Sequence, residues 1–207
     1  MNTGTIKSNL RDYYNRDAGR RDGGGKQDWK IREREAFCHL AVGENKKSLL
    51  EIGAGTGHDS RYFIEQGFDV VAVDLSDEMV KVCKKKCIEA YELDFYGLHM
   101  LERQFDCIWA MNCLLHVPKS DFLRVLGGID AALNENGLFF MGVYGGRDTE
   151  DEWVNDLDDT PRFFSYYSEP KLKEALQGVF DIVRFEQYDV GRNIDFQSVV
   201  MKKRAGL

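Results

Sequence analysis

The chain has 207 residues, 43% of them hydrophobic and 12% aromatic, and its formal net charge is -7. This composition excludes a disordered chain, and the length suits a single domain with one core. The acidic balance disfavours a nucleic-acid partner, because a phosphate backbone would meet a repulsive field. A small-molecule partner is therefore favoured.

Cysteine usage and the lack of long apolar runs indicate a reducing, aqueous setting. The five cysteines show no disulfide-like spacing, and no charged-then-apolar leader opens the chain. We therefore expect the protein in the cytoplasm. No apolar run approaches the roughly 20 residues that cross a bilayer, so we expect no membrane span. Histidine and cysteine positions form no metal-ligand set, and we expect no metal.

The N-terminal part, residues 1–45, has the pattern of a helical arm. Residues 5–18 and 28–40 are polar with interleaved aromatic and aliphatic side chains, which is typical of surface helices. Three glycines at residues 23–25 separate the two helices and leave the backbone loosely restrained. We therefore predict a hinge here between a mobile arm or lid and the body of the protein.

Residues 46–146 have the pattern of a core in which strands and helices alternate. Short apolar runs predict strands at residues 48–52, 69–74, 87–93, 105–111 and 137–143. Helical stretches separate them at residues 59–66, 77–86 and 120–133. This alternation is typical of a parallel α/β sheet covered by helices on both faces.

Residues 147–207 follow a different pattern. The acidic stretch 149–159 predicts an exposed loop, and residues 169–176 predict a helix with Pro170 at an early position. Apolar runs at residues 180–185 and 196–201 predict a terminal hairpin. Six carboxylates in the loop suggest a cation site, but a solvated loop is favoured; they are Glu150, Asp151, Glu152, Asp156, Asp158 and Asp159.

A glycine-rich loop follows the first predicted strand. Its glycines, Gly53, Gly55 and Gly57, are spaced G-x-G-x-G, whereas dinucleotide enzymes use G-x-G-x-x-G. Free amide groups converge where the strand stops, so a polar or anionic ligand can bind there. Glu51 adds a carboxylate that would accept hydrogen bonds from an amine or orient the loop. A purely structural role for Glu51 remains open.

Two further carboxylates close the next two strands. Asp74 lies 21 residues after Gly53, where a carboxylate can accept both hydroxyls of a ribose. Asp94 precedes Phe95, which places an acceptor beside a flat ring, as adenine would require. The fourth strand leads to Asn112 and then to His116. We expect all these strand ends to meet at one rim of the sheet.

These motifs together resemble the class I S-adenosylmethionine-dependent methyltransferases over about residues 49–144. The resemblance implies a Rossmann-like, doubly wound, seven-stranded sheet, mostly parallel with an antiparallel last strand, and S-adenosylmethionine as cofactor with S-adenosylhomocysteine as product. It also implies a set of cofactor-binding residues: Glu51, Gly53, Ala54, Gly55 and Gly57 around the methionine part, Asp74 and Leu75 at the ribose, Asp94 and Phe95 at the adenine, Asn112 near the sulfonium, and Tyr14 as a cover.

The acceptor side rests on fewer residues. Methyl transfer is an in-line displacement, so the protein mainly aligns the reactants and keeps the pocket dry. His116 is the predicted general base, and a role in shaping the pocket is equally favoured. Tyr144, Arg162 and Tyr166 are predicted to bind the acceptor, with Arg162 holding a carboxylate. The aromatic stretch 161–167 forms either a lid or core packing.

The sequence therefore predicts a single methyltransferase domain that methylates an oxygen or nitrogen of a small molecule. One alternative is a methyltransferase that modifies tRNA. Another is a binding module that keeps the cofactor but lacks chemistry. We expect a monomer or a homodimer.

Overall fold

The computed structural model describes residues 2–155, 158–191 and 194–205, and its centre is a seven-stranded sheet. The strand order is β3-β2-β1-β4-β5-β9-β8. Neighbours among β1 to β5 run parallel, whereas β9 is antiparallel to both β5 and β8. The predicted sheet and its antiparallel last strand are confirmed. The strands are β1 (Ser48–Ile52), β2 (Asp69–Asp74), β3 (Glu89–Glu92), β4 (Phe105–Met111), β5 (Leu133–Gly145), β8 (Phe180–Asp189) and β9 (Asp195–Lys203).

Helices cover both faces of this sheet. On one face lie α2 (Asp28–Gly43), α3 (His58–Glu65) and α4 (Asp77–Lys85), and on the other α5 (Lys119–Ala131) and α6 (Glu169–Gln177). Because side chains alternate along a strand, Trp109 and Phe140 stack at 3.8 Å on the face of α2, while Ile108 and Phe139 pack on the face of α5. Two short 3-10 helices, η1 (Leu98–Leu101) and η2 (Leu114–His116), complete the layers.

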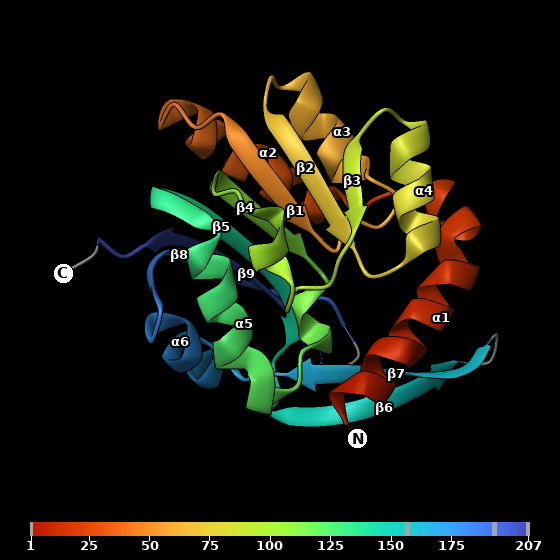
Figure 1. Cartoon of the computed structure of the whole chain (residues 1–207). Coiled ribbons are helices and arrows are strands. Elements are labelled where there is room, and N and C mark those ends of the chain that lie inside the picture. The colour runs from red at the N-terminus through yellow and green to blue at the C-terminus, as the bar shows by residue number, and fades with distance from the viewer. Residues whose placement is uncertain (1, 156–157, 192–193, 206–207) are drawn as a thin grey trace.

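Two further elements lie across the carboxyl ends of the parallel strands. Figure 1 shows α1 (Thr3–Asp22) and the two-stranded ribbon of β6 (Thr149–Asn155) and β7 (Asp158–Tyr166) together below these ends. The inner side of α1 buries Ile6, Leu10 and Tyr13. This packing sets α1 against the open end of the sheet, which is where ligands of α/β sheets bind.

The expectation of an exposed loop at residues 149–159 is wrong over the described part of that stretch. Residues 149–155 form β6, in which Asp151 pairs with Phe164 and Trp153 with Arg162. The sequence of this strand has no alternating apolar pattern, because the side chains of residues 149–154 are exposed to solvent. Of the six carboxylates, Asp156 lies outside the described residues.

Several predicted boundaries also shift. β5 begins at Leu133, where we expected the helix after β4 to end, because Leu133 pairs with Phe105 across the sheet. β3 begins at Glu89 because Cys87 takes the left-handed conformation, with φ of 60°, in the turn before it. At the strand ends that border the site the shifts are small: β3 ends one residue earlier than expected, at Glu92, and β5 ends two residues later, at Gly145.

Candidate active site

A cavity of about 630 Å³ opens at the carboxyl ends of the parallel strands, between the sheet and α1. Its walls come from α1, the start of α2, the glycine loop, the ends of β2, β4 and β5, and β7. Most residues predicted for the site line it: Tyr14, Glu51, Gly53, Ala54, Gly55, Asp74, Leu75, Asp94, Phe95, Asn112, His116, Tyr144 and Arg162. Gly57 and Tyr166 are not among the lining residues.

The glycine loop requires glycine at two positions for steric reasons. Gly53 has a φ of 67°, and a Cβ there would lie 2.3 Å from the Cβ of Cys113. Gly57 has a φ of 76°, and its Cβ would lie 2.6 Å from Cδ1 of Ile88. Any side chain would therefore clash with the wall behind the loop and strain the backbone. Gly57 thus supports the loop from behind without facing the cavity.

Asp74 ties this loop to the end of β2. Its carboxylate accepts hydrogen bonds from the amides of Gly55 at 2.8 Å and Ser76 at 2.9 Å. Burial raises its pKa, while both amide contacts oppose that rise. Asp74 therefore has a defined orientation, with its carboxylate at the cavity wall.

Glu51 is buried at the end of β1 and accepts a hydrogen bond from the hydroxyl of Ser60. Burial and then the nearby charge of Asp59 raise its pKa to about 8. Because burial disfavours the charged form of Glu51, a cation placed beside it in the cavity would favour the ionised carboxylate. The position therefore suits a ligand ammonium group.

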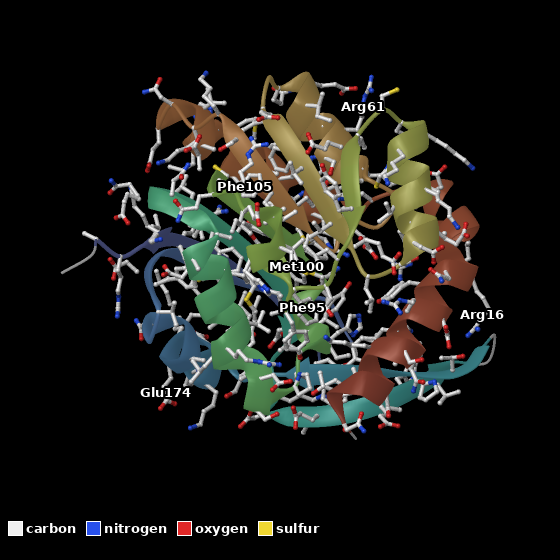
Figure 2. All side chains as sticks on the ribbon, viewed as in Figure 1. Arg16, Arg61, Phe95, Met100, Phe105 and Glu174 are labelled. Carbon is white, nitrogen blue, oxygen red and sulfur yellow. The ribbon has the colours of Figure 1, made fainter. Side chains whose placement is uncertain are left out.

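Asp94 and Phe95 follow β3 at the other end of the cavity. Asp94 accepts a hydrogen bond from the amide of Tyr96 at 2.8 Å and pairs with Lys7 of α1 at 2.5 Å. In Figure 2 Phe95 lies beside the carboxyl end of β3, whereas Arg16 points outward from α1. A flat ring and a carboxylate thus line one end of the cavity.

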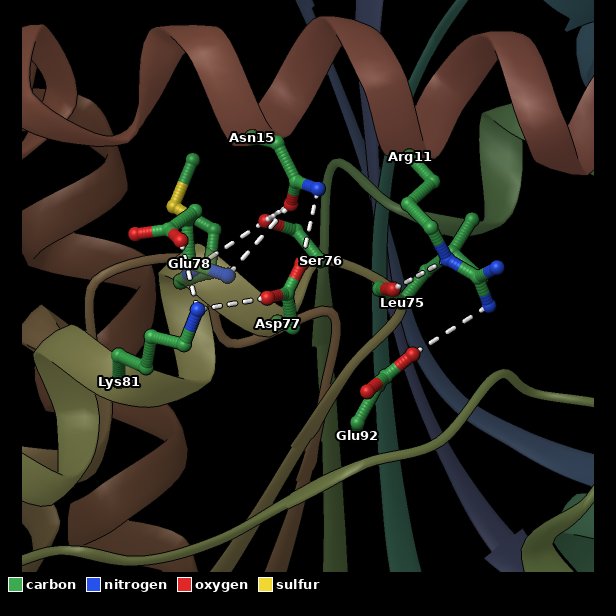
Figure 3. Close-up of polar contacts among 9 residues, drawn as sticks. Arg11, Asn15, Leu75, Ser76, Asp77, Glu78, Lys81 and Glu92 are labelled. Atoms are coloured by element: carbon green, nitrogen blue, oxygen red, sulfur yellow. Dashed lines mark hydrogen bonds and ion pairs between the residues drawn. The ribbon is translucent and has the colours of Figure 1, made fainter.

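Polar contacts dock α1 on the turn after β2 (Figure 3). Asn15 accepts a hydrogen bond from the hydroxyl of Ser76 at 2.5 Å and donates to Asp77 at 2.8 Å. Arg11 donates to the carbonyl of Leu75 at 3.3 Å and pairs with Glu92 at 3.5 Å. These contacts hold α1 over the sheet, so the side of α1 that carries Tyr14 faces the cavity.

His116 lies beneath Tyr14 and has both ring nitrogens engaged. Nδ1 is 2.7 Å from the carbonyl oxygen of Phe163, and Nε2 is 2.7 Å from the hydroxyl of Tyr14. A carbonyl only accepts, so Nδ1 carries the proton and Nε2 accepts from Tyr14. Burial lowers the pKa of His116 to about 4, which keeps the ring neutral. His116 can therefore take up a proton only by way of Tyr14.

Arg162 is buried in the wall formed by β7. Its guanidinium lies over the rings of Tyr13 at 4.2 Å, Trp153 at 4.9 Å and Phe164 at 5.2 Å. Figure 1 shows β7 next to α1, which is why an arginine of β7 can reach tyrosines of α1. The aromatic surroundings hold the planar cation in place at the edge of the cavity.

The other two residues predicted to bind the acceptor have different positions. Tyr144 is the penultimate residue of β5 and lines the cavity, and burial raises its pKa. Tyr166 stacks on Phe164 at 6.0 Å and lies under the guanidinium of Arg147 at 4.3 Å. Tyr166 thus lies two residue pairs along the ribbon from the lining residue Phe164, outside the cavity lining.

The sequence interpretation overlooked a set of basic residues that line the cavity from α1, the glycine segment and α2: Arg20, Arg21, Lys26, Lys30 and Arg34. A signal for two of them was present, because Lys30 and Arg34 are four residues apart in a predicted helix and therefore share a face. Asp59, which pairs with Lys26 and Arg34, was overlooked as well.

Within the part of the chain that the structure describes, no cluster of three or more His, Cys, Asp or Glu side chains is arranged to hold a metal ion. Among the same residues, no helix combines the length and apolar composition needed to cross a membrane.

Known proteins share both the sequence pattern and the fold. A family model described as a methyltransferase domain matches residues 29–179. An uncharacterized methyltransferase of Alkaliphilus oremlandii is 29% identical over 105 residues, 50% of this chain and 48% of that protein. A ubiquinone biosynthesis O-methyltransferase of Xanthomonas campestris is 28% identical over 102 residues, 46% of this chain and 42% of that protein. The chain spans about half the length of these curated relatives.

A solved structure extends the likeness in fold over nearly the whole chain. The 1,6-didemethyltoxoflavin-N1-methyltransferase of Burkholderia thailandensis, with bound 1,6-didemethyltoxoflavin and S-adenosylhomocysteine, superposes with a TM-score of 0.76. It is 22% identical, and the match covers 99% of this chain and 92% of that one. Since the family model matches well over half of the residues, the chain belongs to the class I S-adenosylmethionine-dependent methyltransferase family.

Proposed function

We propose that this protein transfers a methyl group from S-adenosylmethionine to an oxygen or nitrogen of a small-molecule acceptor. The observation that carries the proposal is the joint placement of Glu51, Asp74 and Asp94 with the glycine loop around one cavity. Glu51 and Asp74 lie at the carboxyl ends of the neighbouring parallel strands β1 and β2, and Asp94 comes just after β3, so their spacing is set by the sheet. This spacing suits a ligand with an amine, a ribose and an adenine in a row.

The residues present fit the cofactor along its length. Glu51 would hold the ammonium group, since burial leaves its carboxylate in need of a cation. Asp74 would hold the ribose hydroxyls, and Asp94 with Phe95 the adenine. The Oδ1 atom of Asn112 is buried at the cavity with no hydrogen-bond partner among the described residues, so it can accept from a ligand. When bound, the cofactor supplies an electrophilic methyl group on a sulfonium.

The acceptor would bind beyond Asn112, between Tyr144 and the ribbon. Arg162 and Phe164 line this side and offer a fixed cation beside an aromatic ring. Such a wall suits a flat, acidic small molecule. The relatives named above act on oxygen in one case and on nitrogen in another, which supports either atom as the target.

His116 would serve proton removal through Tyr14. The acceptor's proton would pass to the Tyr14 oxygen while the Tyr14 proton moves to Nε2 of His116, and the Phe163 carbonyl would hold the ring in place. The low pKa of His116 makes it a weak base, so it takes the proton only as the acceptor atom bonds to the methyl group and its own proton becomes strongly acidic. Alignment and exclusion of water therefore supply most of the catalysis.

Calorimetric titration with S-adenosylhomocysteine, followed by an assay with metabolite pools, tests the proposal. Asp74→Asn should weaken binding about tenfold or more, because it loses a charged acceptor for the ribose. Asp69→Asn is the matched control, since Asp69 lies exposed at the other end of the same strand. Equal binding by wild type and Asp74→Asn would refute the ribose assignment.

The assay with metabolite pools decides between the competing functions. The expected result is formation of S-adenosylhomocysteine together with an acceptor that has gained one methyl group. Methylation of tRNA instead of small molecules would favour a tRNA-modifying enzyme. Cofactor binding without turnover of any acceptor would favour a binding module without chemistry.

A further inference from the structure

Six lysine and arginine side chains line the cavity: Arg20, Arg21, Lys26, Lys30, Arg34 and Arg162. Four of them have carboxylate partners. Arg20 and Arg21 pair with Asp17 at 2.6 and 2.7 Å, and Lys26 and Arg34 pair with Asp59. Among the described residues, neither Lys30 nor Arg162 has a carboxylate within ion-pair distance.

Of these two, Arg162 is surrounded by aromatic rings in the wall formed by β7, whereas Lys30 enters the cavity from the first turn of α2. The residue is only 9% exposed. Its ammonium group lies 3.5 Å from the hydroxyl of Tyr144, 5.0 Å from the centre of the Trp29 ring and 5.5 Å from that of the Tyr144 ring. The ammonium group of Lys30 is thus surrounded by two aromatic rings and the neutral hydroxyl of Tyr144.

The charges around Lys30 do not compensate for this burial. Lys26 and Arg21 repel a proton on Lys30, and Asp59, which attracts it, is already bound by two other cations. Burial is the largest effect and lowers the pKa of Lys30 to about 8. A buried cation without a counter-charge destabilises a fold, so an anion that enters the cavity would be stabilised there.

We propose that Lys30, together with the hydroxyl of Tyr144, binds a carboxylate inside the cavity. The inference rests on the proposed function, because the carboxylate belongs either to the methionine part of the cofactor or to the acceptor. Two adjacent donors match the two oxygens of a carboxylate. Tyr144 also borders Asn112, so the carboxylate lies close to the point where the cofactor's sulfonium is expected.

Calorimetry with two probes separates the sources. S-adenosylhomocysteine carries the methionine carboxylate, and 5′-methylthioadenosine keeps the thioether nucleoside but lacks the amino-acid part. The variant is Lys30→Met, which keeps the length of the side chain and removes its charge. Arg32→Met is the matched control, because Arg32 lies on the same helix and is exposed.

If the carboxylate is the cofactor's, Lys30→Met weakens S-adenosylhomocysteine binding about tenfold or more and leaves 5′-methylthioadenosine binding within about twofold. Titrations at pH 8 in two buffers of different ionisation enthalpy should then show that the wild type takes up as much as about half a proton more than Lys30→Met on binding, because any proton that Glu51 releases is common to both proteins. The reason is that a bound carboxylate raises the pKa of a half-protonated lysine.

If the carboxylate is the acceptor's, Lys30→Met binds both nucleosides like the wild type. The complex of the wild type with S-adenosylhomocysteine then binds members of a panel of small carboxylic acids more tightly than their matched amides, and Lys30→Met removes that preference. The proposal is overturned if Lys30→Met equals the wild type with both nucleosides and with the acid panel. Failure of the wild type to bind S-adenosylhomocysteine refutes the proposed function instead, and the acid panel on the free protein then decides about Lys30.

Discussion

The neutral, buried state of His116 predicts a pH-dependent loss of stability that one substitution removes. The folded protein holds the pKa of His116 at about 4 instead of its ordinary 6.5. Between these values the unfolded chain binds a proton that the folded chain does not, so stability falls as pH falls. At about 1.4 kcal/mol for each pKa unit, the loss reaches about 3 kcal/mol by pH 4 and vanishes above pH 6.5.

His116→Gln should remove this dependence, because glutamine does not titrate. Urea unfolding of the ligand-free protein at a series of pH values from 4 to 7.5 gives the free energy of unfolding of each variant. The expected result is that the wild type loses about 3 kcal/mol relative to His116→Gln on acidification. The difference between variants is needed because Glu51, whose pKa is raised to about 8, makes the folded state gain protons over part of the same range.

His39→Gln provides the control, since His39 is exposed on α2 and its environment changes little on unfolding. A constant difference between wild type and His116→Gln across this pH range would refute the buried, doubly hydrogen-bonded state of His116. The same result would remove the basis for coupling His116 to Tyr14.

Three further predictions follow from the cavity wall. Gly53→Ala should lower the free energy of unfolding by about 1–3 kcal/mol and abolish tight binding of S-adenosylhomocysteine, because its Cβ would overlap that of Cys113; thermal melts and calorimetry measure both. Lys30→Met should stabilise the ligand-free protein by about 3 kcal/mol at pH 7, and the gain should disappear between pH 8 and 10.5 in urea unfolding, as the wild-type lysine loses its proton. Tyr14→Phe should slow methyl transfer about tenfold to a hundredfold but change cofactor affinity little, as single-turnover kinetics would show; an unchanged rate would exclude proton transfer through Tyr14 to His116.

The placement of the three carboxylates that we propose for the cofactor could be predicted from the sequence because the sheet sets its geometry. Glu51 and Asp74 lie at the carboxyl ends of β1 and β2, Asp94 comes two residues after β3, and the parallel register pairs Ile52 with Val73 and Asp74 with Glu92. Residues at the carboxyl ends of adjacent parallel strands must lie close together. The short strand patterns and the parallel topology are therefore enough to bring these three carboxylates together, without knowledge of contacts between distant segments.

The ribbon of β6 and β7, in contrast, could not be predicted from the sequence. Strands are predicted from apolar alternation, but the first half of β6 carries three consecutive acidic residues, Glu150, Asp151 and Glu152, all exposed to solvent. Its pairing with β7 depends on Phe164 and Arg162 facing α1 and the cavity, a contact between segments far apart in the sequence. The acidic composition of residues 149–159 therefore led us to miss the ribbon, which together with α1 lies across the open end of the sheet.

The acceptor side depends on the same kind of distant contact. His116 meets Tyr14 across 102 residues of sequence and the Phe163 carbonyl across 47, so a single imidazole joins the sheet to α1 and to the ribbon. Because both segments bind the same ring, we expect a shift of either one to change the proposed proton path and the proposed acceptor wall together. We therefore expect acceptor specificity and proton removal to be coupled through His116, and cofactor binding by Glu51, Asp74 and Asp94 to be independent of that contact.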